Sequence, residues 1–190
     1  MAVRLFVASF FEPGFEDRLK DIAGYARANA GIGTVKWVEP RNFHLTYAFL
    51  GEVPQTKAAV KGMEAGLEGL KSFRISTGSF GVFPSSRHPS VLWAGIAEGA
   101  GDLRQLAGKL AEGLTGAGLV FENRFEPHVT IGRVKRRLPD NFIRRASDFS
   151  LAKKAVSSLC SVELVESVLT PEGPAYRQIY SKKLLPYEKS

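Results

Sequence analysis

Two short tracts with one shared pattern constrain this chain more than any other feature. They are His44-Leu45-Thr46-Tyr47 and His128-Val129-Thr130-Ile131, with 84 positions from the first histidine to the second. Each lies in an apolar run rich in β-branched and aromatic residues, which predicts a strand. Residues two apart in a strand project from the same face, so each strand offers one histidine beside one threonine. The repeat predicts two similar halves that face each other across a phosphate-sized cleft.

Histidine is scarce here, which gives the repeat more weight. The chain has three histidines in 190 residues. The third, His88, lies in Ser85-Ser86-Arg87-His88-Pro89-Ser90, whose serine and proline content predicts a loop. It has no threonine two positions later, and we interpret it as a surface residue. A single histidine on a strand is usually a packing or solvent-facing residue, whereas the repeated pattern favours a catalytic pair.

Length and composition indicate an ordinary globular protein. We expect one bilobal domain over residues 1–190, a length that can bury a sizeable core. A single cysteine, Cys160, excludes an intramolecular disulfide and a cysteine-built metal site. No apolar stretch reaches membrane-spanning length, and residues 1–7 lack the pattern of a secretory signal. We therefore expect a cytoplasmic protein with no membrane partner.

Hydrophobic patterning predicts helices that alternate with pairs of strands. We expect helices over 13–30, 55–70, 102–114 and 139–146. We expect strands over 3–11, 35–38, 43–50, 73–83, 91–96, 119–125, 162–170 and 175–184, besides the second motif strand. Paired strands between helices favour an α+β fold with largely antiparallel sheets over a doubly wound parallel fold. The glycine-dense residues 113–118 lack the lysine of a phosphate-binding loop and are interpreted as a helix terminator.

The flanks of the two tracts resemble a known family. Trp37 precedes the first tract and Phe49-Leu50-Gly51-Glu52-Val53 follows it, while Val91-Leu92-Trp93-Ala94-Gly95 and the segment from Ser167 to Tyr176 extend the likeness over nearly the whole chain. Together they resemble the two-histidine (2H) phosphoesterases. Within these, the likeness is to the RNA 2′,3′-cyclic phosphodiesterases, also called 2′-5′ RNA ligase-like proteins. The resemblance implies two pseudo-symmetric lobes with outer helices and an active cleft between them.

The two histidines suit the hydrolysis of a cyclic phosphodiester. This reaction needs a base that activates water and an acid that protonates the departing ribose oxygen, and the histidine pKa of about 6.5 suits both roles. Spacing alone does not say which histidine is which. The resemblance implies that His44 is the proton donor and His128 the proton acceptor. We expect Thr46 and Thr130 to donate hydrogen bonds to the non-bridging phosphate oxygens.

The expected substrate is RNA with a 2′,3′-cyclic phosphate end, hydrolysed to a 2′-phosphate. Run backwards, the same chemistry is 2′-5′ RNA ligation. Two alternatives stay open: a phosphodiesterase on 2′-5′ oligoadenylates or small cyclic nucleotides, and an RNA-end binding protein. No metal site or cofactor is expected, because two distant histidines without clustered carboxylates fall short of a three- or four-ligand set. The oligomeric state is left open.

Phe49 and Arg133 each lie five positions after their histidine. The resemblance implies that they contact the nucleotide, Phe49 by stacking on a base and Arg133 through phosphate or base. Strict alternation places an offset of five on the opposite face. The motif strands must therefore bend or end before these positions, or the assignment is wrong, and Phe49 as a core residue is an equal alternative. For Tyr47 and Ile131, and for the aromatic residues Trp37, Trp93 and Tyr176, we expect packing roles.

A basic run follows the second tract. Eight lysines and arginines lie between Arg133 and Lys154, with only Asp140 and Asp148 opposing them, in a chain of net charge +7. Such a run is typical either of a solvated surface or of a path for an RNA backbone.

Overall fold

The computed structural model describes residues 3–85, 87, 89–171 and 173–187, so the prediction for His88 lies outside the described residues. The described chain forms four α-helices, one 3₁₀-helix and nine strands. In chain order they are β1 (Val3–Ser9), α1 (Pro13–Asn29), β2 (Val35–Trp37), η1 (Pro40–Asn42), β3 (Leu45–Val53), α2 (Thr56–Gly66), β4 (Phe73–Phe83), β5 (Val91–Ile96), α3 (Ala100–Gly116), β6 (His128–Val134), α4 (Phe142–Ala152), β7 (Val156–Leu159), β8 (Ser161–Thr170) and β9 (Gly173–Lys183).

The strands form one curled sheet in the order β7-β4-β5-β6-β3-β1-β8-β9, with β2 paired to β6. Every pairing between these strands is antiparallel. The predicted α+β class with largely antiparallel sheet is therefore confirmed. The motif strands β3 and β6 meet at the centre through the pair Leu45–Val129. These residues hold the same position in the two tracts, so a local two-fold axis passes between them.

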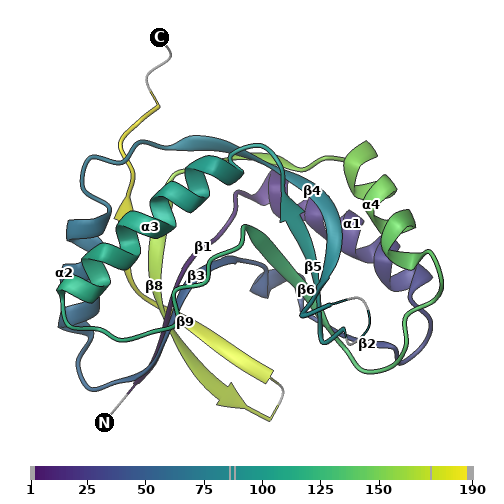
Figure 1. Cartoon of the computed structure of the whole chain (residues 1–190), viewed down its shortest axis with the longest axis horizontal. Coiled ribbons are helices and arrows are strands. Elements are labelled where there is room, and N and C mark those ends of the chain that lie inside the picture. Colours follow the sequence, from purple (N-terminus) through teal and green to yellow (C-terminus); the bar gives the residue numbers. More distant parts are fainter. Residues whose placement is uncertain (1–2, 86, 88, 172, 188–190) are drawn as a thin grey trace.

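Helices cover the two ends of the sheet as two pairs (Figure 1). α1 and α4 pack together near β4 and β7, and α2 and α3 pack together at the other end. The helix predicted over 13–30 is confirmed as α1, and its residues Phe15, Leu19, Ile22 and Ala26, at helical spacing, are all buried. The helices thus bury one face of the sheet in the main core and leave the other face to the histidines.

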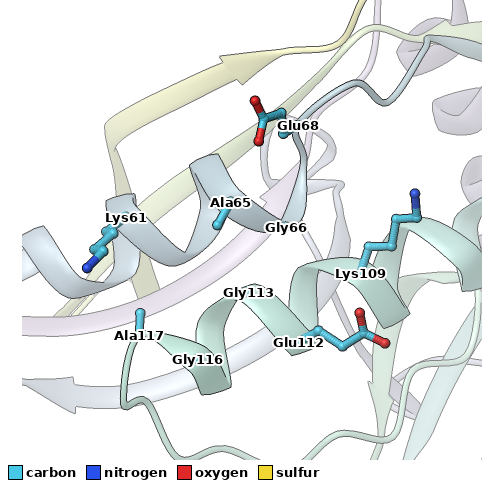
Figure 2. A pocket seen from close by; sticks show the side chains of 9 residues that line it. All are labelled: Lys61, Ala65, Gly66, Glu68, Lys109, Glu112, Gly113, Gly116 and Ala117. Carbon is cyan, nitrogen blue, oxygen red and sulfur yellow. The ribbon is translucent and has the colours of Figure 1, made fainter.

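Glycines let α2 and α3 approach closely (Figure 2). A Cβ atom at Gly66 would lie 2.5 Å from the carbonyl oxygen of Lys109, and one at Gly113 would lie 2.3 Å from that of Gly62. A glycine inside a helix costs about 1 kcal/mol relative to alanine. Here the cost is offset by backbone contact between the helices, so these glycines form the packing surface between α2 and α3.

Two strand predictions differ from the structure. Residues 119–125 form no strand in the described chain, and Val120 is 94% exposed. The reason is that β5 occupies one edge of β6 while β2 and β3 occupy the other, so no edge is left for this segment. The short strand β7, which pairs with β4, was missed. The fourth helix begins at Phe142 and not at Pro139.

Within the described residues, no helix is both long and apolar enough to cross a membrane. The cytoplasmic location stays a prediction.

Candidate active site

The predicted side-by-side placement of histidine and threonine is what the motif strands show. His44 and Thr46 are half-buried, while Leu45 between them is fully buried. His128 and Thr130 repeat this arrangement on β6. We call the side of the sheet that carries these four residues the histidine face. Tyr47 and Ile131 are buried in the core, as expected from their packing roles.

Both histidine rings are held by the same backbone contact. Nδ1 of His44 lies 2.7 Å from the carbonyl oxygen of Asn42, and Nδ1 of His128 lies 2.7 Å from that of Glu126. A carbonyl oxygen can only accept, so each Nδ1 carries a hydrogen whether the ring is neutral or charged. Nε2 is left as the atom that gains or loses a proton. The two rings are therefore oriented alike, with their exchangeable nitrogens directed away from the backbone.

A β-bulge at the fourth residue of each tract changes the alternation. On β3, the residues on either side of Tyr47 pair with consecutive residues of β1. On β6, the residues on either side of Ile131 pair with consecutive residues of β5. Each bulge inserts one extra residue and shifts all later side chains to the other face. Phe49 and Arg133 therefore lie on the histidine face, which removes the conflict that strict alternation raised.

Phe49 is 69% exposed, so it is not a core residue. Its ring lies 6.1 Å from that of Phe6, and the Phe6 ring lies 5.1 Å from His44. Arg133 is exposed, and its guanidinium influences the pKa of the Tyr176 hydroxyl on β9. Burial raises that pKa, and the charge of Arg133 opposes the rise. Arg133 from one half thus lies near an aromatic residue of the other half.

Aromatic rings enclose both histidines. Tyr176 meets His44 edge-on with the ring centroids 5.4 Å apart, and Phe10 lies 5.8 Å from the same ring. On the other half, the centroids of Phe83 and Trp93 lie 5.1 and 6.2 Å from that of His128. The sequence placed Trp93 and Tyr176 as packing residues and did not single out Phe10 or Phe83. A local pattern cannot show these contacts, because each joins segments that are far apart in the sequence.

This enclosure lowers the pKa of both histidines. Burial is the main cause for each ring, since an apolar surrounding disfavours the charged form. The backbone contacts at Nδ1 oppose the effect in both cases. The charge of His128 lowers the pKa of His44 further. The histidines are therefore close enough for the protonation of one to affect the other, as two groups acting on one phosphate must be.

The threonine hydroxyls are free to bind a ligand. Neither Thr46 nor Thr130 makes a side-chain hydrogen bond within the part of the chain that the structure describes. The register through Leu45 and Val129 directs His44 toward Thr130 and Thr46 toward His128. Two donors and two proton carriers thus converge at the local two-fold axis.

A buried carboxyl group lies in the same row of the sheet. Glu163 on β8 pairs with Ala8, which in turn pairs with Thr46. The Ser181 hydroxyl lies 3.0 Å from Oε1 of Glu163, and burial raises the pKa of the carboxyl. A raised pKa reduces the negative charge that this row presents to an anionic substrate.

Among the described residues, no group of three or more His, Cys, Asp or Glu side chains is placed to hold a metal ion. The prediction of a metal-free reaction needs an activity measurement.

Comparisons of the sequence with known proteins identify the family. The profile of the 2′-5′ RNA ligase superfamily matches residues 20–167. A protein of Archaeoglobus fulgidus named RNA 2′,3′-cyclic phosphodiesterase is 35% identical over 179 residues, covering 93% of this chain and 98% of the relative. A protein of the same name from Aeropyrum pernix is 37% identical over 161 residues, covering 82% and 89% of the two chains. The chain belongs to the 2′-5′ RNA ligase superfamily.

Solved structures agree on the fold. The crystal structure of TT0787 of Thermus thermophilus matches with a TM-score of 0.74 at 25% identity, covering 97% of this chain and all of the other. Escherichia coli LigT in its apo form matches with a TM-score of 0.71 at 21% identity, covering 97% and 98%.

Proposed function

We propose that this protein hydrolyses the 2′,3′-cyclic phosphate end of RNA to a 2′-phosphate, without a metal ion or nucleotide cofactor. The observation that carries the proposal is the two-fold arrangement of His44 with Thr46 and His128 with Thr130. The relatives from Archaeoglobus fulgidus and Aeropyrum pernix carry the name of this activity. Residues from both halves are needed, so residues 1–190 act together as one bilobal domain.

The reaction follows from the two free Nε2 atoms. His128 in its neutral form takes a proton from water as the water oxygen attacks phosphorus. The bond from phosphorus to the ribose 3′ oxygen breaks, and protonated His44 gives that oxygen its proton. The histidines end with their protonation states exchanged, and solvent restores them. The assignment of donor and acceptor rests on the family resemblance, because the two rings are held alike.

Neighbouring groups stabilise and orient the phosphate. The hydroxyls of Thr46 and Thr130 donate to the non-bridging oxygens, where charge accumulates in the transition state. Arg133 binds phosphate or base, and the exposed ring of Phe49 stacks on a base. With a 5′-hydroxyl in place of water, the same ring opening joins two RNA ends: the 5′ oxygen bonds to phosphorus, the bond to the 3′ oxygen breaks, and a 2′-5′ bond results.

Single substitutions of the histidines test the proposal. H44A and H128A should each reduce hydrolysis of a cyclic mononucleotide by about 10²–10⁴-fold, since each removes one acid–base group. Both variants should keep the wild-type circular dichroism spectrum. More than about a tenth of wild-type activity in either folded variant contradicts the scheme.

A substrate panel separates the alternatives. RNA with a cyclic phosphate end, a 2′-5′ oligoadenylate and ADP-ribose cyclic phosphate are compared at equal concentration. Preference for either of the last two assigns the site to a different phosphodiester. Tight binding of RNA ends without turnover of any substrate favours an RNA-end binding protein.

A further inference from the structure

The basic run after the second tract is divided by the fold between separate surfaces. A hollow of about 670 Å³ lies where β6 ends and α4 begins. We call it the basic groove, and the cationic side chains that line it are Arg87, Lys135, Arg136, Arg137 and Arg144. Arg145, Lys153 and Lys154 belong to the same run but do not line this groove. Charge is therefore concentrated at one place and not spread along the segment.

The lining of the groove combines apolar side chains with cationic side chains, some of which form no ion pair among the residues that the structure describes. Arg137 pairs with Asp140 at 3.1 Å and Arg144 with Asp148 at 3.7 Å. Lys135 and Arg136, in contrast, are exposed and form no ion pair within the described residues. The lining also includes aliphatic side chains from three places in the chain, namely Val82, Pro89, Leu138 and Ile143. A positively charged groove that follows the phosphate backbone is the electrostatic part of single-stranded nucleic-acid binding.

The backbone holds the basic segment in place. The amides of Lys135 and Arg136 both donate to the carbonyl oxygen of Thr34, at 2.7 and 3.2 Å. The amide of Val134 donates to the carbonyl oxygen of Ser90 at 2.9 Å. A cationic segment that is already ordered loses less conformational entropy when it binds than a mobile one.

The groove lies beyond the candidate active site along the chain. Arg133 lies on the histidine face, and Lys135 and Arg136 come directly after Val134, the last residue of β6. Val134 lines the groove and packs against the main core, so an RNA strand passes over the end of β6 on its way from the histidines to the groove. At about 3.3 Å per residue, the seven residues from His128 to Lys135 span roughly 23 Å. A stacked nucleic-acid strand advances about 3.4 Å per nucleotide, so this distance corresponds to about seven nucleotides. An RNA longer than this, with its cyclic end between the histidines, can therefore reach the groove.

We propose that the basic groove binds the backbone of the substrate RNA about seven nucleotides away from the cyclic phosphate. This inference rests on the proposed function, which places the RNA end at the histidine face. The groove makes the enzyme prefer cyclic ends on an RNA chain over free cyclic mononucleotides. The occupant is RNA because its charge complements the groove and its end lies at the neighbouring site.

A matched pair of double variants tests the groove. K135Q/R136Q removes two adjacent cations of the groove that form no ion pair within the described residues. K153Q/K154Q removes two adjacent exposed cations of the same run at the end of α4 and beyond it. Both change the net charge by two. The substrates are a cyclic mononucleotide and an RNA of about ten nucleotides that ends in the same cyclic nucleotide, a length chosen from the spacing above.

The expected results are specific to the long substrate. K135Q/R136Q should reduce kcat/KM for the oligonucleotide about sevenfold or more at 50 mM salt. The ratio of wild type to variant should fall about sevenfold between 50 and 200 mM, because two lost phosphate contacts lower the salt slope by about 1.4 on logarithmic axes. The mononucleotide should be hydrolysed at the wild-type rate. K153Q/K154Q should behave as wild type on both substrates.

Three outcomes would contradict the proposal that the groove binds RNA. Equal losses in the two double variants mean that net charge and not the groove attracts RNA. Equal losses on short and long substrates in K135Q/R136Q mean that the segment supports the fold or the histidine site. An oligo-glutamate of equal charge that binds the groove more tightly than RNA assigns the groove to an acidic peptide.

A binding measurement separates this inference from the proposed function. Fluorescence anisotropy measures binding of the same oligonucleotide with a plain 3′-hydroxyl, which needs no catalysis. If wild type hydrolyses no cyclic phosphate, the proposed function is wrong. The difference in anisotropy between the two double variants still shows whether the groove binds RNA.

Discussion

Replacing Gly81 by alanine should displace Trp93 from its position beside His128. Gly81 on β4 pairs with Trp93 on β5, and the indole ring lies directly over the glycine. A Cβ atom at position 81 would lie 2.1 Å from Cζ2 of the ring. Ordinary carbon contacts are about 3.5–4.0 Å, so the ring must move by roughly 1.4 Å or more. Because its centroid lies 6.2 Å from that of His128, the movement reaches the proposed proton acceptor.

The expected cost has two parts. Overpacking should destabilise the protein by about 1–3 kcal/mol. In a chain of this size, each kcal/mol lowers the Tm by about 2–4 °C. A displacement of about 1 Å at a catalytic group lowers kcat/KM by up to about 10²-fold. Thermal unfolding followed by circular dichroism and hydrolysis of a cyclic mononucleotide measure the two parts separately.

A double-mutant cycle and a control glycine make the test specific. W93F removes the clashing ring atoms together with the indole Nε1, a buried donor without a partner. In G81A/W93F the penalty of G81A should therefore shrink, with a coupling energy of about 0.5–3 kcal/mol. G108A in α3, where nothing lies within 4 Å of the new Cβ, should be neutral or stabilising by up to about 1 kcal/mol. The reasoning is refuted if G81A matches G108A, or if its penalty persists unchanged beside W93F.

Three further predictions concern the histidine face. The profile of kcat/KM against pH should be bell-shaped with its maximum below about pH 6.5, because burial lowers the pKa of both His44 and His128. Each depressed pKa also means that stability is present above about pH 6.5 and is lost as pH falls through the folded-state pKa, and urea unfolding of wild type against H128N checks this. T46V and T130V should each lower kcat/KM about tenfold to hundredfold while the Tm stays near that of wild type; loss of the fold in both variants would remove the evidence for phosphate contacts. Hydrolysis should survive excess EDTA, and activity lost in chelator but restored by a divalent ion would contradict the metal-free scheme.

Local patterns in the sequence were enough to propose the candidate site and to predict most of the helices and strands. The alternation of side chains is a property of a single strand, so the common face of His44 with Thr46 and of His128 with Thr130 could be predicted without any partner strand. The apolar face of α1 follows in the same way from helical spacing. The repeat of the tract indicated two similar halves before any pairing was known.

Contacts between strands decided the features that the sequence left open or predicted wrongly. Phe49 and Arg133 lie on the histidine face because each motif strand carries a bulge, and a bulge is defined by the pairing of two strands. Residues 119–125 have strand-like composition, but both edges of β6 are already taken. Only the tertiary structure placed Trp93 against His128.

For the basic run, too, the sequence gives the charges and the tertiary structure gives their grouping. The sequence determined how many positive charges follow the second tract, because composition needs no fold. Which of them act together was decided by the chain's path: the end of β6 and the start of α4 bring Lys135 and Arg136 into one groove, while Lys153 and Lys154 lie at the end of α4 and beyond it. Charges cooperate when they are close in space, and closeness between segments is a property of the tertiary structure alone.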